Sequence, residues 1–207
     1  MKYFDKNNKL TLMHKDLNKI IRKPEMLETS KNLFINLYSE LKNQIDNLFL
    51  ELKKSENENI IWNLWHIIRI EDLTVNILIR EKESILNEKL KKEINISITD
   101  TGNSLTKEEI KKLAKDINID KLKYYSDKVS ERTINLIKRL KAEDMKRKIN
   151  KISLEKIIKE GGVSKDNLWL IYYWGKKDIA GLLLMPLSRH IIVHLNQCYK
   201  YIKTESN

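Results

Sequence analysis

The segment that decides the fold reads IIWNLWHIIRIED and spans residues 60–72. Its apolar residues fall on more than one side of an α-helix, which predicts a helix buried deeply in the protein. One histidine, His66, lies in the middle of this segment. An imidazole in a buried helix is costly unless it has a polar partner. The segment therefore predicts a core helix and a partner for His66.

Apolar residues recur at three- and four-residue steps along four stretches, which predicts four long helices. The scarcity of turn-forming residues, with 5 Gly and 2 Pro in 207 residues, agrees with long helices joined by few loops. We expect an all-α four-helix bundle with small helical inserts, in one domain over residues 1–207. The expected long helices cover residues 30–54, 60–81, 120–148 and 177–202, with a kink or break at Pro186.

The remaining segments are shorter or polar. Residues 1–28 are polar and contain Pro24, so we expect an irregular N-terminal arm. Thr106 and Glu109 have the spacing of a capping box, which predicts the start of a short helix. A second small helix is expected at residues 153–160, before a glycine pair.

Composition limits the functional classes. The net charge is +11 with a sequence pI near 9.5, but lysines alternate with acidic residues and arginine is scarce, which disfavours a nucleic-acid-binding module. The single cysteine, Cys198, excludes an intrachain disulfide and agrees with a reducing compartment. No signal peptide is evident, and the most apolar stretch, residues 179–187, is too short to span a bilayer. We expect a cytoplasmic protein without a membrane segment.

Two further histidines predict a metal site. His190 and His194 are four residues apart, so one helix face carries both imidazoles. His66 is the candidate third ligand of a divalent ion, with zinc or nickel as the best candidates. Three protein ligands leave positions open for water or substrate, as in catalytic sites. The alternative is that the pair is incidental and His66 is a hydrogen-bonded core residue.

Residues near the histidines have two interpretations each. Arg69 and Asp72 form a structural pair, or Arg69 lies at a pocket rim and holds an anionic group. Trp62 and Trp65 are core anchors, or they wall the metal from water. Gln197 follows His194 by three residues and can hydrogen-bond a ligand imidazole.

The sequence also leaves the roles of several other side chains undecided. Glu71 is either solvated or orients a ligand histidine. Cys198 is interpreted as a small buried apolar residue, and a fourth, thiolate ligand is the less favoured alternative. His14 is expected to be exposed and unrelated to the site. The aromatic residues that precede the last helix either close a pocket or are buried with their loop: Trp169, Tyr172, Tyr173 and Trp174.

Two motifs together resemble the DinB-like superfamily. The pattern W-x-x-W-H-I-x-R-x-E-D at residues 62–72 resembles the second helix of that family, in which the histidine is the first ligand of a three-histidine metal site. The sequence LSRHIIVHLNQ at residues 187–197 resembles its last helix, although Asn196 stands where the family usually has glycine. Residues 83–118 and 150–168 have no counterpart in this resemblance.

The resemblance implies an up-down-down-up four-helix bundle, often a homodimer. Several members of the family are transferases that use a low-molecular-weight thiol such as bacillithiol, mycothiol or glutathione, and others resemble hydrolases. We therefore expect a metal-dependent transferase or hydrolase with a small-molecule substrate. A non-catalytic helical scaffold that binds metal or a partner is the alternative.

Overall fold

The computed structural model describes residues 2–53 and 57–205. Helices make up the regular structure of this part of the chain, and the one extended pairing found there is an isolated bridge between Lys148 and Asp178. The expected all-α class is confirmed.

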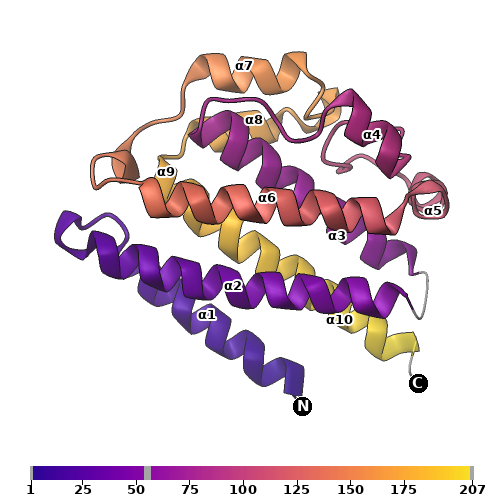
Figure 1. Ribbon diagram of the computed structural model, residues 1–207, viewed down its shortest axis with the longest axis horizontal. Helices are drawn as coiled ribbons and strands as arrows, with labels where there is room; N and C mark the ends of the chain where they lie inside the picture. The colour runs from indigo at the N-terminus through magenta and orange to yellow at the C-terminus, as the bar shows by residue number, and fades with distance from the viewer. Residues whose placement is uncertain (1, 54–56, 206–207) are drawn as a thin grey trace.

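Four long helices form the centre of the molecule. Figure 1 shows α2 and α6 side by side across one face, with α3 and α10 crossing behind them. Their apolar faces meet in a single core, and α3 is buried on all sides as its sequence predicts. The helices are α2 (Leu27–Leu52), α3 (Glu58–Asp72), α6 (Ile119–Arg139) and α10 (His190–Glu205).

Shorter helices cover one edge of this core. In Figure 1, α4, α7 and α8 lie along the upper edge, and α5 lies at its right-hand end. The predicted capping box of Thr106 and Glu109 starts α5. These helices are α4 (Glu88–Ile94), α5 (Lys107–Asp116), α7 (Lys151–Lys159) and α8 (Trp169–Gly175). Another short helix, α9 (Ile179–Leu184), is buried and precedes α10.

The N-terminal segment corrects one prediction. Residues 1–28 were expected to form an irregular arm, but Lys2–Ile20 form helix α1, which packs against α2 and α10. The residues Leu10, Leu17 and Ile21 are fully buried. Their spacing of seven and four residues places them on one helix face, and this weak stripe is hidden by the polar residues around it.

Several helix boundaries also differ from the predictions. Helix α6 ends at Arg139, because Leu140 is extended and the following residues have no apolar stripe that would bury another turn. Ser30 does not cap α2, which begins at Leu27 after a short 3-10 turn at Pro24.

Two π-helical segments adjoin the long helices. Helix α3 continues into Leu73–Ile79, and the predicted break at Pro186 is a π-helical segment, Met185–Arg189, between α9 and α10. Such segments often occur at functional sites. The second one leads directly into the helix that carries His190.

The helical stretch Ile179–Thr204 is long and apolar enough to cross a membrane by length and composition alone. Most of its apolar window, 72%, is buried inside the protein. That burial is typical of the core helix of a packed bundle.

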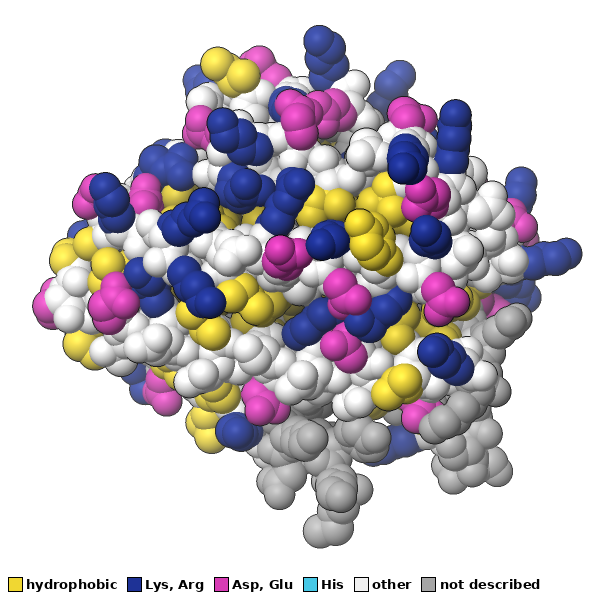
Figure 2. All heavy atoms as spheres, in the orientation of Figure 1, with side chains coloured by type: hydrophobic (Ala, Val, Ile, Leu, Met, Phe, Trp, Pro, Cys, Tyr) yellow, Lys and Arg dark blue, Asp and Glu magenta, His cyan; other side chains and the backbone are white. Residues whose placement is uncertain are grey.

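Charged side chains are mixed on the face in Figure 2. Lysine and arginine lie over α6 and between α6 and α7, with aspartate and glutamate interspersed among them. Many are paired, as Lys42 and Lys123 are with Asp46 and Asp127. On this face the basic residues do not form the continuous stripe that a nucleic-acid backbone would need.

Candidate metal centre

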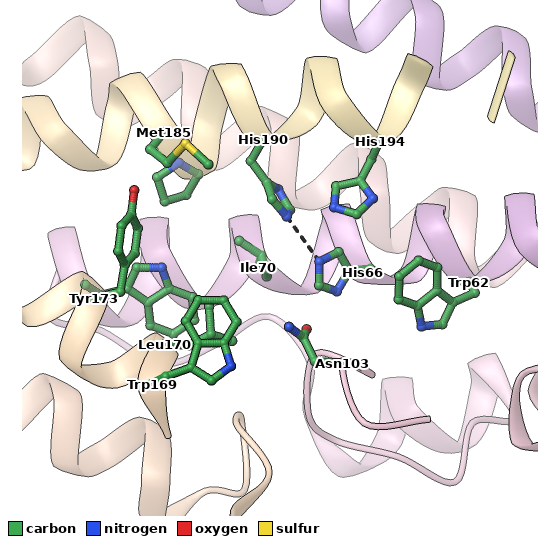
Figure 3. A pocket seen from close by; sticks show the side chains of 12 residues that line it. Trp62, His66, Ile70, Asn103, Trp169, Leu170, Tyr173, Met185, His190 and His194 are labelled. Atoms are coloured by element: carbon green, nitrogen blue, oxygen red, sulfur yellow. Dashed lines mark hydrogen bonds between the residues drawn. The ribbon is translucent and has the colours of Figure 1, made fainter. Parts of the chain in front are cut away.

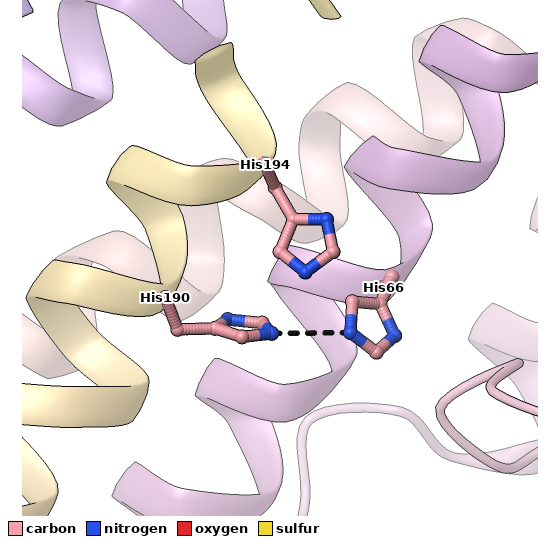
Figure 4. Close-up of side chains that lie close together, drawn as sticks. All are labelled: His66, His190 and His194. Atoms are coloured by element: carbon pink, nitrogen blue, oxygen red, sulfur yellow. Dashed lines mark hydrogen bonds between the residues drawn. The ribbon is translucent and has the colours of Figure 1, made fainter. Parts of the chain in front are cut away.

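The structure brings the three predicted ligands together. His66 lies in the middle of α3, and His190 and His194 lie one turn apart on α10, which packs directly against α3. One ring nitrogen from each of the three lies within 4.8 Å of the other two. Figure 4 shows the three rings pointing toward a common centre.

Hydrogen bonds fix two of the rings. The Nδ1–H of His66 donates to the carbonyl oxygen of Thr101 at 2.7 Å, and His194 Nδ1 lies 2.6 Å from Oδ1 of Asn63. The Asn63 amide is itself oriented, because its Nδ2 donates to the carbonyl oxygen of Asn59 at 2.7 Å. Both histidines therefore carry the proton on Nδ1, which leaves their Nε2 lone pairs facing the centre.

His190 is less constrained. Its Nε2 lies 3.1 Å from Nε2 of His66, and it must donate there because the His66 atom has no proton. Its Nδ1 is buried with no hydrogen-bond partner among the described residues. A cation at the centre would take the place of the proton between the two rings.

Burial keeps all three imidazoles neutral. It lowers the pKa of His66 to about 4, although the bond to Thr101 partly opposes the shift. Burial and then the charge of His66 lower the pKa of His194 to about 3, against a hydrogen bond with Gln197. Burial, followed by the charges of the other two histidines, lowers the pKa of His190 well below its usual value. Neutral imidazole is the form that binds a metal ion.

These residues fit a divalent transition-metal ion. Imidazole nitrogens bind zinc at about 2.0–2.1 Å, so two of them on one ion lie about 3–3.4 Å apart. The separation of 3.1 Å between His66 and His190 agrees with this geometry. The Nδ1–H bonds of His66 and His194 are the supporting contacts that metal-binding histidines usually make.

A cavity of about 380 Å³ adjoins the three rings. The histidines form one end of it, and Trp62 stacks on His66 with ring centroids 5.2 Å apart. The opposite wall comes from α8 and from the π-helical segment before α10, and Figure 3 shows Trp169, Tyr173 and Met185 there.

The loop at residues 99–102 is bound along one face of α3 by hydrogen bonds. The carbonyl oxygens of four consecutive residues, 99–102, each accept a hydrogen bond from a side chain of that helix. The donors are Arg69 Nε to Thr99 at 2.7 Å, Trp65 Nε1 to Asp100 at 3.1 Å, His66 Nδ1 to Thr101 at 2.7 Å and Trp62 Nε1 to Gly102 at 2.9 Å. The two tryptophans thus differ in role, since Trp62 lines the cavity and Trp65 is a core anchor.

Arg69 and Asp72 lie inside the protein and not at the cavity. Arg69 is 1% exposed, and its Nη1 lies 3.1 Å from Oδ2 of Asp72. Asp72 also accepts hydrogen bonds from Asn76, Ser84 and Tyr125 and from two backbone N–H groups. The structural interpretation of the pair agrees with these contacts.

The other candidates lie apart from the metal centre. Glu71 is buried and accepts from Tyr38 and Thr133, and burial raises its pKa, so it is neither solvated nor bonded to a ligand histidine. Burial raises the pKa of Cys198 to about 12, as expected for an apolar thiol. His14 is half-buried on α1, outside the cluster.

Two supporting groups escaped the sequence interpretation. The Thr101 carbonyl is a backbone atom, which carries no side-chain signal, and it lies in the segment that had no counterpart in the family resemblance. Asn63 had a usable signal, because it lies three residues before His66 and shares its helix face. Of the aromatic residues before α10, Trp169, Tyr173 and Trp174 line the cavity, whereas Tyr172 is 72% exposed.

Comparison of the chain with family models, curated proteins and solved structures finds no match.

Proposed function

We propose that this protein is a divalent-metal-dependent enzyme that acts on a small molecule, with the ion held by His66, His190 and His194. The observation that carries the proposal is the convergence of three neutral imidazoles, two of them fixed through Nδ1, at the end of a cavity of about 380 Å³. Zinc and nickel suit this donor set.

The bound ion would lower the pKa of a thiol or water molecule and so supply a nucleophile at neutral pH. The chain itself positions the ligands and excludes water with aromatic side chains. None of the described residues that line the cavity is a carboxylate, so a proton released there has no carboxylate to accept it.

This lining favours a thiol-dependent transferase over a hydrolase. A free thiol already has a pKa of about 8.5, whereas that of bulk water is about 15.7, so the ion has to lower the pKa of a thiol far less than that of water. We infer that a low-molecular-weight thiol is the nucleophile and that a second small molecule accepts it.

We further propose that the chain belongs to the DinB-like superfamily, with its up-down-down-up helix order, and that it is a cytoplasmic homodimer. The support is that both motifs lie on adjacent helices, α3 and α10, and that their histidines meet. Light scattering in solution tests the dimer.

The first test is the metal content of untagged protein. We expect about one zinc or nickel ion per chain in the wild type and in a His14→Ala control, and none in a His190→Ala/His194→Ala variant whose circular dichroism shows intact helices. Absence of metal from the wild type after incubation with both ions would refute the metal site.

The second test is turnover with 1-chloro-2,4-dinitrobenzene and cysteine or glutathione. In this reaction a carbon–sulfur bond forms, the carbon–chlorine bond breaks, and chloride and a proton are released. We expect metal-dependent conversion that the double variant lacks. Metal binding without turnover of this or other electrophiles would favour the non-catalytic scaffold.

A further inference from the structure

The cavity beside the histidines differs in chemistry from the surface of the protein. The chain has a net charge of +11, yet the part of the chain that the structure describes contributes no lysine, arginine, aspartate or glutamate to the lining of the cavity. Its walls are aromatic and aliphatic, with Trp62 and Ile70 beside His66 and with Leu170, Tyr173 and Met185 on the other side of the cavity. An ionised group placed here would lose its hydration without gaining a partner.

One side chain can orient a ligand inside this cavity. Asn103 lines it, and its Oδ1 accepts a hydrogen bond from the Thr101 hydroxyl at 2.8 Å. That bond fixes the amide, so its Nδ2–H groups are available to an acceptor atom. The residue lies on the same loop as the carbonyl that holds His66.

The mouth is bordered by an aromatic side chain held in place by polar contacts. Trp169 is 55% exposed although it lines the cavity, and its Nε1 donates to Oδ1 of Asn167 at 3.1 Å. The Asn167 amide donates to Ser104 at 2.9 Å, which joins the mouth to the Asn103 loop. The indole is therefore a fixed flat surface on which a ring can stack.

We propose that this cavity binds a flat, largely aromatic ligand that is uncharged except at the atom that reaches the histidines, with a hydrogen-bond acceptor that meets Asn103. The inference rests on the proposed function for the reacting end of the ligand only. The volume lies at the lower end of the range of about 300–1,000 Å³ for small-molecule sites, which suits a ligand of two or three rings. The charged body of a peptide-like thiol stays outside it.

Two fluorescent probes with the same ring system test the charge preference. N-phenyl-1-naphthylamine is neutral, and 8-anilinonaphthalene-1-sulfonate adds one sulfonate to the same skeleton. With metal-free protein we expect saturable binding of one neutral probe per chain, at least tenfold tighter than the sulfonate. Binding driven by the basic surface would give the opposite order, because the sulfonate would be attracted by the positive charge.

Variants locate the binding. Met185→Trp fills the cavity and is expected to weaken binding of the neutral probe at least tenfold. Leu12→Trp, at a position that is 59% exposed on α1, should leave this binding unchanged. Trp169→Ala removes the stacking surface at an exposed site, so it should weaken the probe even if Met185→Trp does not fold.

Equal or tighter binding of the sulfonate, or unchanged binding in both cavity variants, would overturn the inference. Metal analysis of the same preparations decides the metal site separately, since the probes are measured without metal.

Discussion

Replacement of Asp72 by asparagine should destabilise the protein more than any surface substitution. The side chain is fully buried, and its two oxygens accept hydrogen bonds from three side chains and two backbone N–H groups besides the ion pair with Arg69. In asparagine, one of the two oxygens is replaced by an NH2 group. The donors that bonded to that oxygen then face another donor. The Tyr125 and Ser84 hydroxyls can rotate to accept, but the Arg69 guanidinium cannot.

The magnitude follows from the buried charge that remains. Breaking a buried ion pair by removing one partner costs about 3–5 kcal/mol. For a domain of this size, each kcal/mol lowers the Tm by about 2–4 °C, so the expected loss is on the order of 10 °C. Urea denaturation followed by circular dichroism measures the free energy of unfolding directly.

Asp46→Asn is the matched control. Asp46 is half-exposed and pairs with Lys42 and Lys123, so its replacement should cost at most about 1 kcal/mol. A second variant, Arg69→Met/Asp72→Asn, should regain part of the loss because it leaves no unpaired charge. If Asp72→Asn loses no more stability than Asp46→Asn, the interpretation of Arg69 and Asp72 as a structural pair is wrong.

Three other perturbations have expected outcomes. Asn63→Leu removes the acceptor of the His194 Nδ1 proton and should weaken zinc binding about 10–100-fold in calorimetry, with helix content unchanged. Cys198, whose pKa is raised to about 12, should resist iodoacetamide in the folded protein at pH 8 and react after denaturation, because only the thiolate is nucleophilic and the unfolded thiol has a pKa of about 8.5. Gly102→Ala should destabilise more than Gly161→Ala in urea: both have positive φ, at 75° and 67°, but a Cβ at 102 meets a tryptophan nitrogen at 3.2 Å and one at 161 meets nothing within 4 Å.

Controls make these outcomes decisive. Asn135→Ala, at an exposed position on α6, should leave zinc affinity unchanged. Equal zinc affinity in Asn63→Leu would mean that the His194 tautomer does not depend on that amide. Rapid alkylation of native Cys198 would contradict its burial, and equal losses in the two glycine variants would mean that backbone strain alone sets the cost.

The features that the sequence predicted correctly are those that depend on the regular spacing of residues along a helix. The apolar pattern of residues 60–72 predicted a buried helix, and the four-residue spacing of His190 and His194 placed both rings on one face. The sequence-based prediction failed for α1, because the buried residues described there are few and lie among many polar ones, so the apolar stripe is weak. The sequence alone did not decide the role of Arg69 and Asp72, because the same spacing occurs in a buried structural pair and at the rim of a pocket. Its surroundings, Ser84 and Tyr125, come from distant parts of the chain.

Of the two segments that had no counterpart in the family resemblance, residues 83–118 contribute to the site through the Thr101 carbonyl and the Asn103 side chain, although no motif in them predicted this. The chain bends at Asp100 and Gly102 has a positive φ of 75°, so successive carbonyls can turn toward the same helix instead of alternating sides as in a regular strand. Positions 62 and 69 of a helix are separated by about 10.5 Å at 1.5 Å per residue, and residues 62, 65, 66 and 69 share one face. Four donors on that face of α3 therefore find four successive acceptors along one loop. Because one of those donors is His66, the contacts that dock the loop onto the bundle also determine which nitrogen of that histidine faces the metal centre.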